Sequence, residues 1–98
     1  SRLYWLGNDL ASLRFQVMII RPDSNGIELI RWQGNQAIEH ARAAGLTGEQ
    51  VSAISGLLAA YLGDPSEQNA QAFAQSLLQL QLRIGERFRA QDETTDGD

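Results

Sequence analysis

The chain has 98 residues, eight basic and twelve acidic, giving a formal net charge of −4, with 43% hydrophobic residues, one His and no Cys. This length predicts a single domain. The absence of cysteine excludes disulfides and thiolate metal sites, and we expect no metal ion or other cofactor. The acidic balance argues against a broad basic surface for nucleic acid.

The first dozen residues contain a short apolar run, Leu3–Leu6, followed by a turn-forming cluster at Gly7–Asp9. Such a run is compatible with a short strand or with an arm that docks on a partner, and a single helical turn over Asp9–Leu13 is a further alternative. The sequence leaves all three open.

The segment Leu13–Arg21 predicts a β-strand, because apolar side chains alternate along it and β-branched residues gather at its end. A strong turn signal follows at Pro22–Gly26, and Ile27–Trp32 predicts a second strand that completes a hairpin. In the favoured register Arg21 lies opposite Glu28, whereas a shorter loop pairs Arg21 with Ile30. The favoured register also joins two apolar pairs: Ile19 with Ile30 and Val17 with Trp32.

The predicted hairpin is apolar on both faces, since Met18, Ile20 and Leu29 lie on the side opposite the main apolar stripe. A two-stranded hairpin is only marginally stable alone in water. We therefore expect the second face to be covered by a third strand from Leu3–Leu6 or by a second copy of the chain.

From Gly34 onward the apolar spacing becomes helical. Asn35 is the expected N-cap of a helix over Gln36–Ala44. Gly45 ends this helix, with Leu46 after it, in the pattern of a Schellman motif.

Two further helices are predicted by their N-terminal signals. Thr47–Gln50 reads as a capping box, Thr at the cap and Gln three residues later, for a helix that runs to Leu62. Asp64–Glu67 reads as a second capping box, with Pro65 at the first helical position, for a long helix that runs to about Ala90.

These elements predict an α+β fold, in which an N-terminal β-hairpin, three-stranded if Leu3–Leu6 joins it, precedes three helices. We expect one domain over residues 1–91. Residues 92–98 are acidic and offer no apolar side chain to a core, so they predict a disordered tail.

The apolar residues of the last helix span about 200° of its circumference, whereas a helix resting on one core needs a stripe only a little over ~100° wide. The excess predicts that this helix contacts both its own core and a partner. The expected partner surface joins five residues of the last helix to three of the hairpin: Phe73, Leu77, Leu78, Leu82 and Phe88 with Met18, Ile20 and Leu29.

The segment Gln36–Ser55 resembles a helix-turn-helix, with Gly45 at the turn and small or apolar residues at the motif's core positions: Ala41, Leu46, Val51 and Ile54. This resemblance implies DNA binding, for which the candidate contacts are Thr47, Gln50, Ser52 and Arg42. The segment departs from the motif at His40, where an apolar residue is usual. Its second helix also has no Arg for phosphate contacts.

No motif for catalysis is present, because the single His has no recognisable partner and no nucleophile, phosphate-loop or paired-carboxylate pattern occurs. We therefore expect a non-enzymatic interaction module, an adaptor, assembly factor or regulator, that forms a homodimer and binds another protein. A helix-turn-helix DNA-binding regulator is the alternative. No stretch approaches the ~20 apolar residues of a membrane helix, so the default expectation is a soluble cytoplasmic protein.

Overall fold

The computed structural model describes residues 2–20 and 22–94, and the side chains within them except at positions 87, 88 and 90–94. These residues form four α-helices and contain no strand. The prediction of an α+β fold with an N-terminal β-hairpin is therefore wrong, and the chain is an all-helical protein over the part described.

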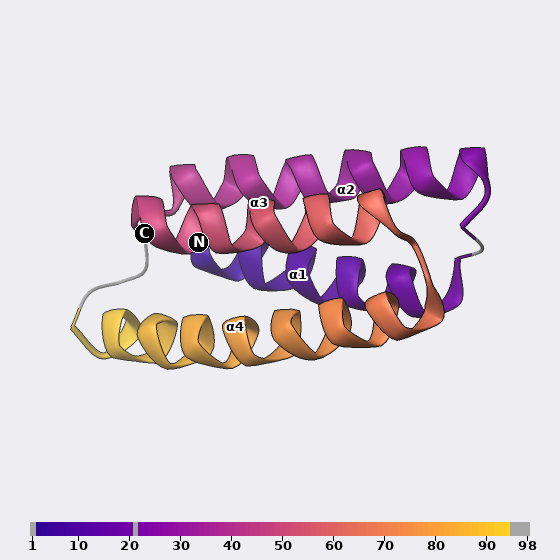
Figure 1. Cartoon of the computed structure of the whole chain (residues 1–98). Coiled ribbons are helices and arrows are strands. Elements are labelled where there is room, and N and C mark those ends of the chain that lie inside the picture. The colour runs from indigo at the N-terminus through magenta and orange to yellow at the C-terminus, as the bar shows by residue number, and fades with distance from the viewer. Residues whose placement is uncertain (1, 21, 95–98) are drawn as a thin grey trace.

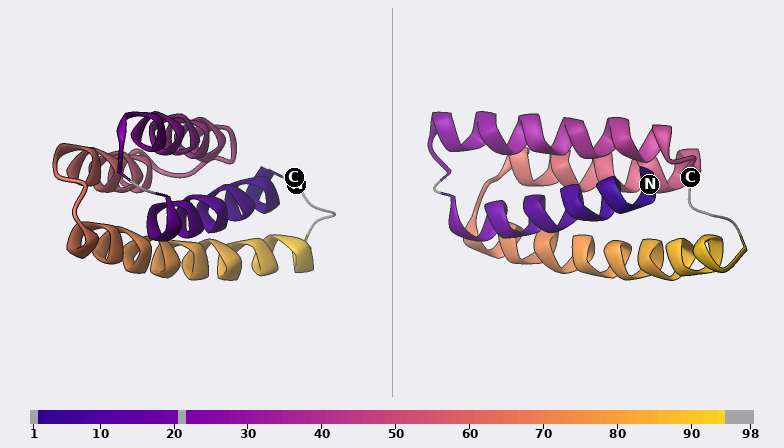
Figure 2. Two further views of the ribbon diagram at one scale, coloured as in Figure 1. Left: turned by 90° about the vertical axis from the view of Figure 1, so that its right-hand side faces the viewer. Right: turned by 180° about the vertical axis from the view of Figure 1, so that it is seen from behind.

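The four helices follow one another with short connections and pack side by side in chain order, α4 closing the bundle against α1 (Figures 1 and 2). The bundle measures 44 × 22 × 19 Å. Short connections favour antiparallel neighbours, as in other up-and-down bundles. The helices are α1 (Arg2–Ile19), α2 (Ser24–Ala43), α3 (Gly48–Gly63) and α4 (Glu67–Thr94).

Helix α1 takes the place of the predicted first strand. Its buried side chains recur every three or four residues, which is the period of one helix face. The alternation at Leu13–Ile20 arose because this helix is apolar on two sides: Leu13 and Val17 are buried, while Phe15 and Met18 are exposed. The buried stripe comprises Leu3, Leu6, Leu10, Leu13 and Val17.

The predicted hairpin turn is the α1–α2 connection. Asp23 is the N-cap of α2, and its Oδ1 accepts a hydrogen bond from the backbone N of Gly26 at 2.8 Å. The predicted second strand is thus the start of α2, in which Glu28 forms an ion pair with Arg31 at 3.4 Å. Arg21, the expected partner of Glu28, lies outside the described residues. The predicted N-cap Asn35 lies inside α2, twelve residues after Asp23.

The α2–α3 connection confirms the predicted Schellman ending and capping box. Gly45 has a φ of 83°, and the backbone N of Gly45 and Leu46 donate to the carbonyls of Arg42 and Ala41. At the start of α3, the Thr47 hydroxyl accepts from the backbone N of Gln50, and the Gln50 side chain accepts from the backbone N of Thr47.

The N-cap of helix α4 lies two residues later than predicted. Ser66 rather than Asp64 receives the capping hydrogen bond, from the backbone N of Asn69 at 3.1 Å. The carbonyl of Asp64 accepts instead from the Asn69 side-chain amide at 2.7 Å. The helix continues to Thr94, so residues 92–94 of the predicted tail are helical and residues 95–98 lie outside the described chain.

The core runs the length of the bundle between all four helices. Helices α2 and α3 approach closely at Gly34, where an added Cβ would stand 2.6 Å from a terminal carbon of Leu58. This close contact accounts for a glycine in the middle of a helix. The largest fully buried side chains are Leu6, Leu10, Leu13, Ile30, Ile54 and Leu77.

Tyr61 is buried in this core and packs against Phe73, with ring centroids 5.8 Å apart. Burial raises the pKa of the Tyr61 hydroxyl above its ordinary value of about 10. Because the unfolded chain then ionises at lower pH than the fold, stability is unaffected below about pH 10 and falls as pH rises beyond it.

We expect Tyr61→Phe to unfold in denaturant like the unmodified chain at neutral pH and to lose less stability at about pH 11, since Phe has no proton to release. Urea titrations at the two pH values test this. Equal losses in the two proteins would contradict a contribution from Tyr61.

Candidate functional site

Nine large apolar side chains among those described are exposed, by 36% to 64% of their surface. Five lie on α1, two on α2 and two on α4, and none lies on α3. Soluble proteins scatter such residues singly, whereas a gathering marks a contact surface. We name this set the α1 face: Tyr4, Trp5, Phe15, Met18, Ile19, Leu29, Trp32, Leu78 and Leu82.

The five α1 members occupy the side of the helix opposite its core stripe. Tyr4, Phe15 and Met18 are separated by eleven and three residues, close to three turns and one turn at 3.6 residues per turn. Trp5 lies beside Tyr4 in an edge-to-face ring contact at 5.4 Å. Helix α1 therefore has one apolar side in the core and another toward solvent.

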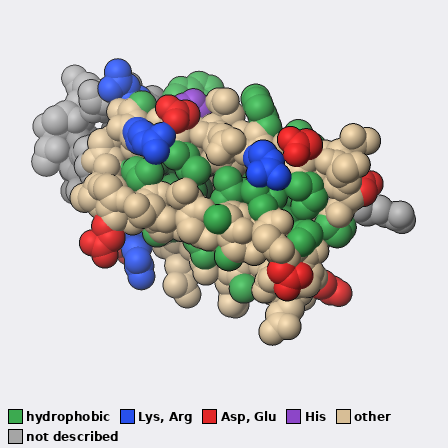
Figure 3. Space-filling model, turned by 45° about the horizontal axis from the view of Figure 1, so that its top comes forward, with side chains coloured by type: hydrophobic (Ala, Val, Ile, Leu, Met, Phe, Trp, Pro, Cys, Tyr) green, Lys and Arg blue, Asp and Glu red, His purple; other side chains and the backbone are tan. Residues whose placement is uncertain are grey.

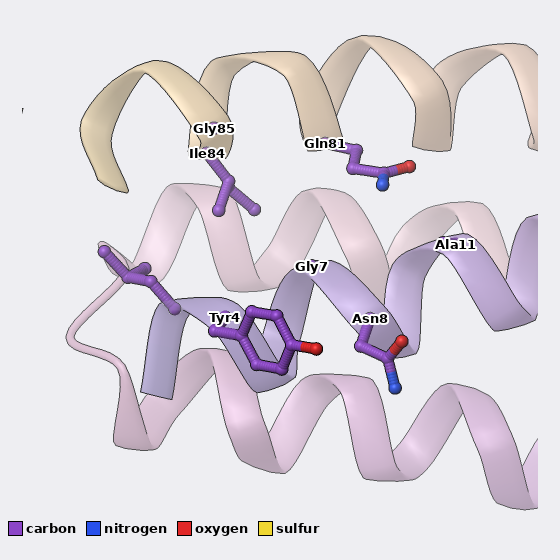
Figure 4. A pocket seen from close by; sticks show the side chains of 8 residues that line it. Tyr4, Gly7, Asn8, Ala11, Gln81, Ile84 and Gly85 are labelled. Atoms are coloured by element: carbon purple, nitrogen blue, oxygen red, sulfur yellow. The ribbon is translucent and has the colours of Figure 1, made fainter. Parts of the chain in front are cut away.

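One of the α4 members, Leu78, borders a groove between α1 and α4. One section, of about 320 Å³, is lined by Tyr4 and Gly7 on α1 and by Gln81 and Ile84 on α4 (Figure 4). The other section, of about 540 Å³, is lined by residues that include Arg14, Met18 and Leu78. Leu82 follows Leu78 by one turn of α4 and is 61% exposed, outside the lining of either section.

One of the α2 members, Leu29, lies at the edge of α2 that faces α1. That edge is fixed by Gln33, whose side-chain amide donates to Asp9 of α1 at 3.4 Å. Leu29 precedes Gln33 by one turn, whereas Trp32 lies about 100° around the helix from Gln33 and is 58% exposed. The exposed apolar residues therefore extend across α1 from the α4 groove to the neighbouring edge of α2.

A polar cluster joins α1 to α2 beside this face. Asp9 accepts from Gln33 through one carboxylate oxygen and pairs with Nδ1 of His40 through the other. The His40 side chain is 43% exposed and that of Asp9 16%. No nucleophile forms part of this cluster, and no group of potential metal ligands occurs among the described residues. Its evident role is to fix α1 against α2.

The residues of the predicted partner surface differ in their exposure in the structure. Met18, Leu29, Leu78 and Leu82 belong to the α1 face. Ile20 is half-buried. Phe73 and Leu77 are 2% and 0% exposed in the core of the single chain, and the side chain of Phe88 lies outside the described set.

Sequence reasoning missed five members of the face, because they lay in segments assigned to strands or left open. A helical projection of residues 2–19 would have placed most of them opposite the buried leucines. The missed residues are Tyr4, Trp5, Phe15, Ile19 and Trp32.

The residues proposed for DNA contact do not form a surface of the kind by which a helix-turn-helix contacts DNA bases. Helices α2 and α3 run antiparallel side by side (Figures 1 and 2), whereas a helix-turn-helix crosses at about 90–120°. The side chains of Thr47 and Gln50 close the capping box, and Arg42 forms an ion pair with Glu39 at 2.7 Å. Ser52 lines a groove between α3 and α4.

The surface over α2 and α3 carries basic and acidic side chains next to one another (Figure 3). Adjacent opposite charges give no continuous positive field for a phosphate backbone. None of the helices in the described part of the chain is long and apolar enough to cross a membrane.

Comparison of the chain with protein-family models, with curated proteins and with solved structures finds no match.

Proposed function

We propose that this protein is a small, non-catalytic interaction module, an adaptor, assembly factor or regulator, that forms a homodimer through the α1 face. The observation that carries the proposal is the gathering of nine exposed large apolar side chains on α1 and on the adjoining edges of α2 and α4. A cytoplasmic location and binding of a further protein remain part of this proposal.

The size of the face supports a stable contact. The four aromatic members are each more than half exposed, and with the five aliphatic ones they present roughly 700 Å² of apolar surface. A standard protein–protein interface buries about 800 Å² on each partner. The face is therefore large enough to form most of one such interface.

A second copy is the simplest occupant, because a two-fold dimer covers the same patch on both subunits with one set of contacts made twice. Its composition also suits an interface, since aromatic residues and Met are enriched in contact surfaces. Both tryptophans of the chain, Trp5 and Trp32, belong to the face and are 57% and 58% exposed in the single chain.

The two tryptophans provide a label-free test. As the chain is concentrated from about 1 to 200 µM, mass action should populate the dimer, shift the fluorescence emission to shorter wavelength and reduce quenching by acrylamide. Emission and quenching that stay constant over this range would overturn dimerisation through this face.

A further inference from the structure

Arg14 lies in the wider section of the α1–α4 groove, and its Nε is buried with no hydrogen-bond acceptor among the described residues. It forms no ion pair with any described carboxylate. A buried donor without an acceptor is costly, and more so when the group is charged. Arg14 is thus a cation on the edge of the α1 face whose Nε has no acceptor among the described residues.

The lining of this wider part of the α1–α4 groove contains no acidic residue. It is lined on α4 by glutamines and small or apolar side chains: Gln68, Gln71, Ala72, Ala74, Gln75 and Leu78. A carboxylate that enters the groove with an apolar neighbour would satisfy both Arg14 and Leu78. Charge complementarity of this kind sets the orientation of two partners more than their affinity.

Glu86 of a second copy is the candidate carboxylate for Arg14. It is exposed, follows Leu82 by one turn of α4, and has no ion pair with the described residues. It therefore continues the exposed side of α4 that carries Leu82, next in sequence to the groove-lining Gly85.

Two-fold symmetry brings the two groups to the same level. Arg14 shares its section of the groove with Gln75 and Leu78, whereas Glu86 lies beyond the section that Gln81 and Gly85 line. A two-fold axis across the middle of α4, near position 80, places position 75 of one copy opposite about position 85 of the other, since both helices rise ~1.5 Å per residue.

We infer that the second copy docks antiparallel along the α1–α4 groove, with Arg14 of each subunit paired with Glu86 of the partner subunit. This inference rests on the proposed homodimer and adds its orientation and its charged contact. The symmetry makes the pair twice in each dimer, at the rim of the apolar contact.

Charge reversal tests the pair by sedimentation velocity. Arg14→Glu and Glu86→Arg should each raise the dimer dissociation constant about tenfold or more, because each places like charges together at two symmetric sites. The double variant restores opposite charges and the original net charge, and it should dimerise within a factor of about three of the unmodified chain. Glu49→Arg, at an exposed position on α3, changes the net charge as Glu86→Arg does and should leave dimerisation unchanged.

Far-UV circular dichroism shows whether each variant is folded, and Arg14→Gln, which removes the charge without reversing it, gives a milder second measurement of the same contact. If the unmodified chain dimerises and the double variant stays as weak as the single ones, the Arg14–Glu86 pair and its antiparallel register are wrong while the homodimer stands. A monomeric unmodified chain would overturn both.

Discussion

Replacing Leu10 by Ala is expected to lower the free energy of unfolding by about 2–5 kcal/mol, the usual cost of truncating a fully buried leucine. Leu10 is 0% exposed and lies midway along the buried stripe of α1. The truncation removes apolar contacts and leaves a cavity that the four packed helices can fill only in part. Urea denaturation followed by circular dichroism measures the loss.

Asn8→Ala is the matched control, since Asn8 is exposed on the same helix two residues away, and a surface change of this kind stays within about 0.5 kcal/mol. A loss for Leu10→Ala no larger than that of the control would mean that α1 is a loosely attached arm instead of a core helix.

Replacing Leu82 by Glu is expected to weaken the dimer about 100-fold or more. Burial of a leucine contributes about 1.5–3 kcal/mol, each tenfold change in affinity corresponds to ~1.4 kcal/mol, and a carboxylate without a partner opposes burial further. Leu82 is 61% exposed in the single chain and Glu is a good helix former, so the bundle should stay folded. Leu78→Glu, at the neighbouring position of the same stripe, should act in the same direction.

Ala59→Glu on α3 introduces the same charge at an exposed helical position away from the α1 face, and it should leave the dimer intact. Sedimentation velocity with circular dichroism separates dissociation from unfolding. Equal affinities for Leu82→Glu and Ala59→Glu would place the contact elsewhere on the molecule.

The helix ends between residues 44 and 50 could be predicted because their signals are local. A glycine at positive φ and a Thr–Gln capping box act within a few residues of chain, so tertiary contacts do not alter their meaning. The predicted start of α4 differs from the observed one by two residues, since Asp64 and Ser66 are both good cap residues and the sequence pattern fits either.

The sequence pattern of the N-terminal half favours strands, although this half forms helices α1 and α2. Residues 13–20 combine alternating apolar side chains with β-branched ones, which is the pattern of a strand, while Gly7–Asp9 resembles a turn. In the structure α1 is continuous through this cluster. Gly7 is not required there by a close contact, since an added Cβ would meet no atom within 4 Å. Asp9 forms side-chain hydrogen bonds with Gln33 and His40 of α2. Contacts across such sequence distances override local propensity.

The excess of apolar surface was visible in the sequence, but its arrangement was not. Met18 and Leu29, which the sequence predicts on the second face of a hairpin, are exposed on helices α1 and α2. Phe73 and Leu77 could not be told from Leu78 and Leu82 by spacing alone, because α1 and α3 together determine which side of α4 is covered. Only the packed bundle distinguishes its core residues from its exposed ones.

Sedimentation equilibrium on the unmodified chain tests the central claim most directly. The α1 face predicts a mass approaching twice the 10.8 kDa of one chain at high micromolar concentration, decreasing toward the single-chain mass on dilution. A mass of 10.8 kDa that persists at high micromolar concentration would contradict the proposed homodimer.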